Sequence, residues 1–300
     1  MSEGLSGILL VDKPAGITSQ QALTKIKRAC GISKLGHAGT LDPFATGLLV
    51  VLIGKATRLQ EFLLLDSKSY EGVILVGQRT DTDDVTGTVM LPSAECPSDS
   101  ELSRRCSELE KRFSGTINQI PPNFSAVHID GKRAHQLARG GAEMEGKLHP
   151  REVTVHELRL ECLGSSRLRY YLRCSKGTYV RSLARDIGDF LGAGACVESL
   201  RRTSSGELSV DRAVTVASLV DEPGSLAAAL LPAESALAGF GRWNFSEREV
   251  SLLRQGRQEP LGGLPRGGVS NIAGLFSNTG ELIGVAQESA DLGWRLRLNY

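Results

Sequence analysis

The stretch GHAGTLDPFATGLL, residues 36–49, is the most distinctive segment of the chain. Its three glycines and one proline predict a loop whose backbone can pass close to a ligand. The loop runs directly into residues 48–53 (LLVVLI), an apolar run typical of a buried strand, so we expect a rigid base beneath it. Asp42 on such a loop can serve as a nucleophile, a general base or a ligand. The alternative is that Asp42-Pro43 only initiates a turn, and spacing alone does not separate the two interpretations.

Periodic apolar residues on both sides of this loop predict an α/β chain. Strands are expected at residues 7–11, 70–76, 153–162 and 167–174, and helices at about 19–30, 102–113 and 180–191. Within residues 153–162 the alternation of apolar residues slips by one position, which predicts a β-bulge near His156.

A smaller, β-rich unit is expected at the C-terminal end. Residues 231–241 (LPAESALAGFG) are interpreted as the linker to it. Ser246 and Glu249 have the spacing of a capping box, which predicts a short helix. Residues 272–276, 282–286 and 294–298 are strand-like, and the turn at 277–280 is expected to join the first two as a hairpin.

Composition indicates a soluble, cytoplasmic protein. Hydrophobic residues make up 41% of the chain and charged residues 23%, which is enough apolar material for a core. The longest apolar runs are far shorter than the roughly 20 residues of a membrane-spanning helix. No basic region precedes the first apolar stretch, which argues against a secretory signal. The six cysteines include no CxxC pair, so free thiols in a reducing compartment are expected.

Charge is distributed unevenly along a chain whose net charge is only +1. Acidic residues dominate residues 66–101, and basic residues dominate residues 159–185. Such segregation can create a basic face that attracts a polyanion, although a solvated charged surface is the simpler alternative. On the strand at 167–174, Arg167, Arg169 and Arg173 share one face with Tyr171, which is either plain exposed sheet or a phosphate-contacting surface.

Other common active-site motifs are missing from the sequence. No P-loop, HExxH pair or GxSxG elbow is present, which leaves phosphate cradles, zinc proteases and serine hydrolases without support. Asp81, Asp83 and Asp84 lie close together, but the glycine and the terminal glutamate of an EF-hand loop do not follow them.

Several blocks together resemble the tRNA pseudouridine synthase B family. They fall in the family's order at residues 10–16, 36–49, 68–70, 77–84, 121–141, 174–181 and 200–203, and the GTLDP-x-ATG core is highly specific. The resemblance implies isomerisation of uridine-55 in the T-loop of tRNA to pseudouridine, without a metal or an organic cofactor. His128 and His135 depart from the family pattern, which puts some RNA contacts of residues 121–141 in question.

The resemblance also implies roles for individual residues. Asp42 matches the catalytic aspartate, whose carboxylate attacks either the ribose C1′ or the base, and Arg181 matches its cationic partner. Tyr70 matches the aromatic residue that stacks on the flipped uracil, and Tyr179 lines the same pocket. His37 and Leu200 match further substrate contacts.

The implied architecture is an α+β type of α/β fold in two domains. Residues 1–236 would form the catalytic domain, with a central, largely antiparallel sheet and flanking helices. Residues 242–300 would form a PUA-like, β-barrel-like RNA-binding unit. The partner is expected to be the T-arm of tRNA, with no membrane and no obligate protein partner, and the protein is expected to be a monomer.

Two other classes of function stay open at this point. One is a non-catalytic tRNA-binding or tRNA-folding protein of the same fold. The other is a different nucleotide-directed enzyme, such as a base hydrolase that uses Asp42 alone.

Overall fold

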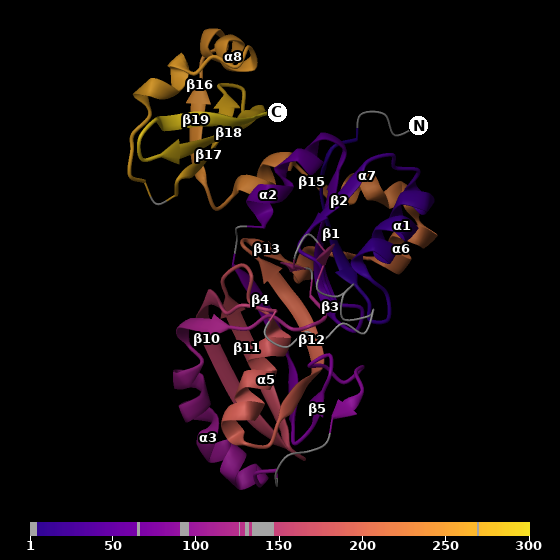
Figure 1. Cartoon of the computed structure of the whole chain (residues 1–300). Helices are drawn as coiled ribbons and strands as arrows, with labels where there is room; N and C mark the ends of the chain where they lie inside the picture. The colour runs from indigo at the N-terminus through magenta and orange to yellow at the C-terminus, as the bar shows by residue number, and fades with distance from the viewer. Residues whose placement is uncertain are drawn as a thin grey trace.

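A long mixed sheet forms the centre of the molecule, and a smaller sheet forms its C-terminal end (Figure 1). The computed structural model describes residues 5–64, 67–90, 96–125, 127–129, 132–133, 147–268 and 270–300. His135 and the side chain of His128 lie outside the described residues, so the expectation attached to them stays a prediction.

The long sheet has the strand order β14-β1-β3-β12-β4-β11-β10-β7. Its strands are β1 (Gly7–Lys13), β3 (Thr46–Ile53), β4 (Lys68–Val76), β7 (Gly115–Gln119), β10 (Arg151–Gly164), β11 (Arg167–Cys174), β12 (Ala195–Ser205) and β14 (Val214–Thr215). Three short strands pair along it: β2 (Leu35–Ala38) with β3, β13 (Leu208–Ser209) with β12, and β15 (Leu230–Leu231) with β1. The pairs β1–β14 and β3–β12 are parallel and the other pairs are antiparallel. The predicted largely antiparallel sheet is therefore confirmed.

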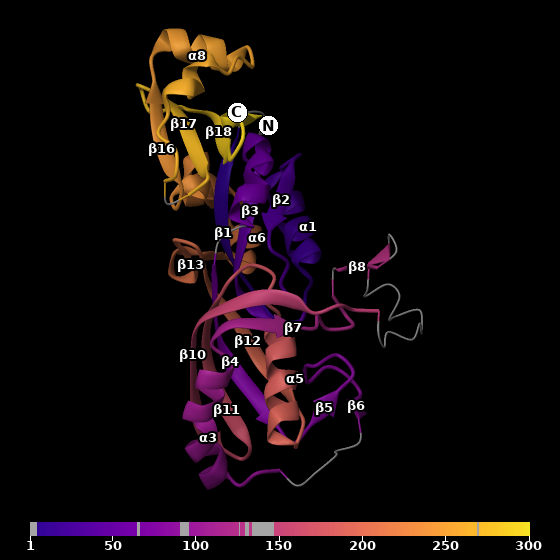
Figure 2. The same cartoon turned by 60° about the vertical axis from the view of Figure 1, so that its left-hand side comes forward.

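The main helices cover one face of this sheet: α1 (Ser19–Cys30), α3 (Asp99–Arg112), α5 (Val180–Leu191) and α6 (Val216–Asp221). Their apolar stripes form a single core with the inward-facing side chains of the strands, and α1 and α5 lie on the same side of the sheet (Figure 2). α1 begins with a capping box formed by Thr18 and Gln21, and it ends at Gly31, whose φ is 64°. The predicted helices are therefore confirmed to within a few residues.

Short elements complete the chain between these strands and helices. They are the helical turns η1 (Gly54–Leu59), α2 (Gln60–Leu63), η2 (Val210–Arg212), η3 (Pro223–Ser225) and α7 (Leu226–Ala229), and the hairpins of β5 (Arg79–Thr80) with β6 (Val89–Met90) and of β8 (His128–Ile129) with β9 (Lys132–Arg133). No helix of the described residues is long and apolar enough to cross a membrane.

The β-bulge predicted near His156 is present. The pairing of β10 with β11 shifts register between Val155 and Glu157. The bulge lets the apolar side chains before and after it point into the same core, because one extra residue restores their common face.

The arginines between residues 159 and 185 do not form a free basic face. Each one has a carboxylate partner: Arg159 and Arg173 pair with Glu157, Arg167 with Glu198, Arg169 with Glu161, Arg181 with Asp42, and Arg185 with Asp83. The pairing favours the alternative of a solvated charged surface for the exposed arginines of β10 and β11. Glu157 and Glu161 lie close to their arginines in sequence, whereas Asp42, Asp83 and Glu198 reach theirs only once the sheet is assembled.

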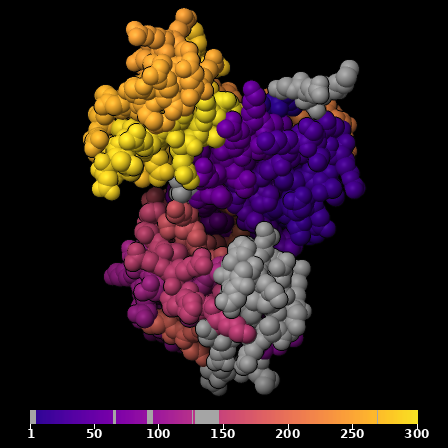
Figure 3. Space-filling view, turned by 45° about the horizontal axis from the view of Figure 1, so that its top comes forward, coloured from indigo at the N-terminus to yellow at the C-terminus, as the bar shows by residue number. Residues whose placement is uncertain are grey.

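The C-terminal unit packs on the other face of β1 and β3. It contains the sheet β16 (Gly241–Phe245), β17 (Ile272–Ser277), β18 (Leu282–Ser289) and β19 (Gly293–Asn299), the helix α8 (Glu247–Arg254) and the turn η5 (Glu259–Gly263). Ser246 and Glu249 form the predicted capping box of α8, and β17 pairs with β18 as the predicted hairpin. Figure 3 shows this unit in direct contact with the N-terminal part of the chain.

A shared apolar cluster joins the two parts of the molecule. Ile8 and Leu10 of β1 belong to the same cluster as Phe276 and Val285 of the C-terminal sheet. The segment interpreted as a linker contributes to it as well, because the turn η4 (Ala233–Leu237) buries Ala233, Ala236 and Leu237 there. The linker prediction is therefore wrong for residues 233–237, since small apolar residues spaced three apart pack as one face of a helical turn.

Candidate active site

Asp42 lies in the loop between β2 and β3, and this loop is fastened to the start of α1. The Leu41 N–H donates a hydrogen bond to Ser19 Oγ at 2.9 Å, and the same hydroxyl donates to the Leu41 carbonyl at 3.1 Å. The Gly16 N–H donates to the Pro43 carbonyl at 2.8 Å. The loop is thus held in place on both sides of the Asp42 side chain.

The backbone at Asp42 does form a turn, as the simpler interpretation of Asp42-Pro43 predicted. The Ala45 N–H donates to the Asp42 carbonyl at 3.1 Å. The loop then ends at Gly47, whose φ is 96°, and a Cβ atom there would lie 2.3 Å from the Arg202 carbonyl oxygen. The turn and the close approach of β12 together fix the direction in which the Asp42 carboxylate points.

Arg181, the second residue of α5, holds that carboxylate. Its Nε lies 2.9 Å from Asp42 Oδ2, and its Nη2 donates to Oδ1 at 3.0 Å. The guanidinium also donates to the carbonyls of Thr82 and Phe124, each at 2.9 Å. Arg181 is 5% exposed and the Asp42 side chain 35% exposed. The carboxylate is therefore fixed in orientation but open on one side.

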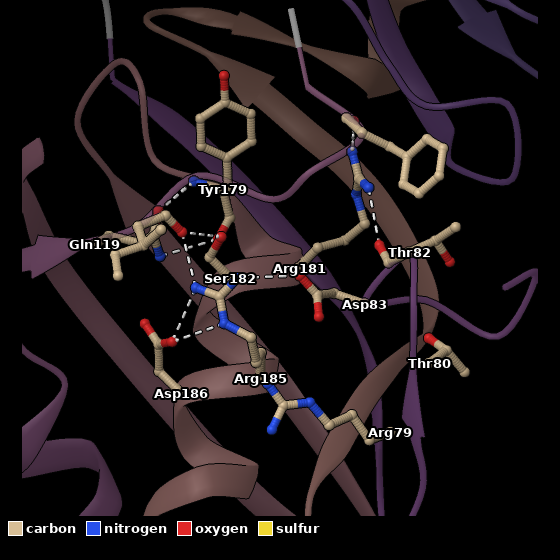
Figure 4. A network of polar contacts seen from close by, with 12 residues as sticks. Arg79, Thr80, Thr82, Asp83, Gln119, Tyr179, Arg181, Ser182, Arg185 and Asp186 are labelled. Carbon is tan, nitrogen blue, oxygen red and sulfur yellow. Dashed lines mark hydrogen bonds and ion pairs between the residues drawn. The ribbon is translucent and has the colours of Figure 1, made fainter. Parts of the chain in front are cut away.

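Two aspartates that follow β5 extend this network. Asp84 Oδ2 lies 3.8 Å from Arg181 Nη1, and Asp83 pairs with Arg185 of α5 at 3.1 Å. Arg185 also donates to the Ile120 carbonyl at 2.7 Å. In Figure 4, Arg181 and Arg185 of α5 lie beside the segment that follows β5, which carries Thr82 and Asp83. Asp83, Asp84 and Arg185 were not among the residues predicted for the site. The signal for them was the acidic excess of residues 66–101, which lies opposite the basic residues of α5.

Two buried cations stand on the other side of Asp42. Lys13 is fully buried, and its ammonium donates to the carbonyls of Pro14 (2.8 Å), Ile17 (2.8 Å) and Pro43 (3.4 Å). Burial lowers the pKa of Lys13 to about 8, and the negative charge of Asp42 opposes this shift. Because its donors are taken up by backbone carbonyls, Lys13 holds the fold of the loop, as expected for a residue that is not itself catalytic.

Arg202 is the second buried cation and was not singled out from the sequence. Its Nε donates to the Leu48 carbonyl at 2.7 Å and its Nη2 to the Gly39 carbonyl at 3.0 Å. It is only 2% exposed. Arg202 therefore connects β12 to both ends of the loop that carries Asp42.

The pKa of Asp42 reflects opposing effects of burial and of the neighbouring charges. Burial raises the pKa of the carboxyl group most strongly, and the adjacent Arg181 lowers it. The charge of Asp84 raises this pKa further, and that of Lys13 lowers it. The ionised form of Asp42 is thus sustained chiefly by Arg181.

Tyr70 and His37 both lie next to Arg202. Burial raises the pKa of the Tyr70 hydroxyl, while a hydrogen bond with Arg202 and its positive charge oppose the shift. Burial also lowers the pKa of His37, and the charge of Arg202 lowers it further. Nδ1 of His37 is buried and has no hydrogen-bond partner among the described residues. The structure therefore groups Tyr70 and His37 around one cation close to Asp42.

Tyr179 is placed by a reciprocal pair of hydrogen bonds at the start of α5. Its backbone N–H donates to Gln119 Oε1 at 2.7 Å, and Gln119 Nε2 donates to the Tyr179 carbonyl at 3.0 Å (Figure 4). Burial raises the pKa of its hydroxyl, whereas the charge of Arg181 lowers that pKa. Tyr179 thus lies within electrostatic range of the Asp42–Arg181 pair.

Leu200 differs from the other predicted site residues in its surroundings. Its side chain is 7% exposed and belongs to the main apolar core. It lies on β12, next to the start of β3, where Thr46 Oγ1 donates to its carbonyl at 3.4 Å. Leu200 therefore borders the site from within the core.

No group of three or more His, Cys, Asp or Glu side chains in the described part of the chain is placed to hold a metal ion. The chemical resources of the site are a fixed carboxylate, three buried cations and aromatic side chains. Such a carboxylate can act as a nucleophile, a general base or a ligand.

The chain is similar to members of one protein family over most of its length. The family model described as TruB family pseudouridylate synthase (N terminal domain) matches residues 27–180, and the model described as tRNA pseudouridylate synthase B C-terminal domain matches residues 181–238. The tRNA pseudouridine synthase B of Azoarcus sp. (strain BH72) is 41% identical over 85% of this chain and 83% of its own length. The protein of the same name from Methylobacillus flagellatus is 35% identical over 97% of this chain and 93% of its own length.

Solved structures show the same fold. The structure titled "Crystal Structure of a Cbf5-Nop10-Gar1 Complex" matches with a TM-score of 0.71 at 24% identity, covering 98% of this chain and 83% of that one. The chain therefore shares its overall fold with the matched chain of that complex. The sequence relatives then define the family: the chain belongs to the TruB family of pseudouridylate synthases, and the enzyme is an isomerase.

Proposed function

We propose that the protein isomerises uridine-55 in the T-loop of tRNA to pseudouridine. The observation that carries the proposal is the Asp42 carboxylate, fixed by Arg181 at 2.9 and 3.0 Å and open on one side. The curated relatives are named for this reaction on tRNA, which supports tRNA as the substrate. The T-loop position follows from the resemblance of residues 36–49 to the family's catalytic block.

Asp42 acts as the nucleophile in this proposal. If the carboxylate attacks the ribose C1′, the bond from C1′ to N1 breaks and uracil leaves with the bonding electrons. The uracil turns, its C5 attacks C1′, and the ester to Asp42 breaks. The proton on C5 is lost and N1 gains one, so the product has the mass of the substrate. In the other order the carboxylate first attacks the base, and the same atoms are conserved.

The target base must leave the loop stack to reach a carboxylate held on a protein loop. Tyr70 supplies an aromatic face for the extruded uracil, and Tyr179, His37 and Leu200 supply the walls of its pocket. Their placement around Arg202 and the Asp42–Arg181 pair supports these roles. The C-terminal unit, residues 242–300, would add RNA contact area, and a cytoplasmic monomer without a cofactor would suffice for the reaction.

The test is incubation of the purified protein with an unmodified tRNA transcript. We expect a pseudouridine at position 55, mapped by a chemical reagent selective for it, with no change in RNA mass and no release of uracil. Release of free uracil would identify a base hydrolase instead. Binding without either change would identify a tRNA-binding or tRNA-folding protein.

A further inference from the structure

A groove between α1 and α6 lies beside the loop of Asp42. It has a volume of about 800 Å³. Its apolar surface comes from Pro14 and Ile17 on one side and from Val216 and Val220 of α6 on the other. Val220 is 42% exposed, which is high for a valine next to a helix packed on the core. None of the roles assigned above uses this groove.

Unpaired positive charge lines the α1 wall of the groove. Lys25 and Arg28 line it directly, and Lys27 is exposed on the same helix. α1 carries no acidic residue, and within the described ranges no ion pair joins these cations to a carboxylate. By contrast, every arginine between residues 159 and 185 has a carboxylate partner. The cations of α1 therefore differ from the arginines of residues 159–185, because they have no carboxylate partner among the described residues.

The groove and the catalytic loop belong to one hydrogen-bonded unit. The Lys13 ammonium binds the carbonyls of Pro14 and Ile17, which belong to the floor of the groove, and that of Pro43 in the loop. The Gly16 N–H donates to Pro43 as well. α1 and α5 lie on the same side of the sheet (Figure 2). An RNA strand that delivers a base to Asp42 can therefore continue across the groove.

We infer that this groove is a second RNA contact, in which Lys25 and Arg28 bind backbone phosphates of the same tRNA whose uridine enters the Asp42 site. The inference rests on the proposed function for the identity of the RNA. Phosphate contacts position an RNA without reading its sequence, and the apolar floor suits the carbon face of the ribose. The carboxylate of Asp221, on the opposite wall, repels the phosphates, so they approach from the side of α1.

The inference predicts a change in the salt dependence of binding. Each phosphate contact adds about 0.7–0.9 to the slope of log K against log salt concentration. The double variant Lys25→Ala/Arg28→Ala should bind unmodified tRNA transcript roughly tenfold more weakly at 0.15 M salt, with a slope flatter by about 1.5. The matched control is Arg159→Ala/Arg169→Ala, which removes the same charge from the paired face and should leave the slope unchanged.

A second variant guards against a folding defect. Asp221→Asn removes the acid from the groove and should tighten tRNA binding by about twofold to threefold, which a misfolded protein would not do. Wild-type affinity and slope in the Lys25→Ala/Arg28→Ala variant would overturn the inference, and would leave the groove to a protein partner. If the groove variants behave as expected but the wild type makes no pseudouridine, only the proposed function fails. If the wild type is active and the groove variants bind normally, only this inference fails.

Discussion

The guanidinium of Arg181 contacts both oxygens of Asp42, at 2.9 and 3.0 Å, while only 5% of the arginine side chain is exposed. This contact opposes the main effect of the environment, because burial raises the pKa of Asp42 and Arg181 lowers it. Thr82, Phe124 and Asp84 hold Arg181 in turn, so its position does not depend on Asp42 alone. The charge of the Asp42 carboxylate is therefore controlled chiefly from the start of α5.

Replacing Arg181 with methionine should move the acid side of the pH–activity profile to higher pH. Without the cation, burial and Asp84 raise the pKa of Asp42 without opposition from Arg181, so more of the carboxyl group is protonated at neutral pH. The rate at pH 7 should fall by on the order of 100-fold. Single-turnover rates between pH 5 and 9 check this, with Arg181→Lys as the charge-retaining control. An acid limb that stays where it is in Arg181→Met would contradict the role given to the pair.

Because of Lys13, the free energy of unfolding should change with pH in the alkaline range. Its folded-state pKa is lowered from 10.5 to about 8, so between these values the unfolded chain binds a proton that the folded chain does not. Stability from this group therefore rises with pH across that window, by roughly 3 kcal/mol in all. Urea unfolding at pH 8, 9 and 10 should show this rise in the wild type relative to Lys13→Met. Parallel pH profiles for the two proteins would rule it out.

Gly47→Ala should reduce activity by forcing a change in the backbone that carries Asp42. A Cβ atom at Gly47 would lie 2.3 Å from the Arg202 carbonyl oxygen, and the φ of 96° already disfavours any other residue. We expect a loss of at least about 2 kcal/mol of stability and a displaced Asp42 loop. Gly224→Ala is the control, because nothing lies within 4 Å of a Cβ atom there. Thermal unfolding and pseudouridine yield for the two variants decide the matter, and equal behaviour would refute the steric argument.

Truncation at residue 240 should destabilise the rest of the chain. The cut removes Phe276 and Val285 from the cluster that buries Ile8 and Leu10. Exposing even a few such side chains costs about 1.5–3 kcal/mol each, which is comparable with the total stability of a domain. We therefore expect a large drop in melting temperature or insoluble protein. A truncated chain that melts at the wild-type temperature would show that the C-terminal unit is an independent module.

Local patterns were sufficient to predict the longer helices and most of the longer strands, but not the central strand β12. The alternation of residues 167–174 predicted β11 with its observed ends, and the slip in the preceding strand predicted the bulge at His156. The segment 233–237 was mistaken for a linker because its burial depends on partners in β17 and β18, which no local pattern contains.

The residues of the site could not be predicted from periodicity alone. Asp42 and Arg181 lie 139 residues apart, and only the family resemblance placed them together. The same long-range pairing explains the charge segments, since Asp83 and Asp84 supply carboxylates to Arg185 and Arg181. Charge counts along a chain cannot show which charges the fold will neutralise. Arg202 was missed for a similar reason, because an arginine in a strand carries no sign that it will be buried.

The variant Asp42→Asn tests the central claim most directly. It keeps the size of the side chain but removes the charge and replaces one acceptor oxygen with a donor NH2 group, so one of the two contacts with Arg181 is lost. Arg181 retains its contacts with Thr82 and Phe124. The loop should therefore survive without its nucleophile. We expect tRNA affinity within about tenfold of wild type, equivalent to roughly 1.4 kcal/mol, and no detectable pseudouridine. Pseudouridine formation by Asp42→Asn at near the wild-type rate would show that Asp42 is only a turn residue.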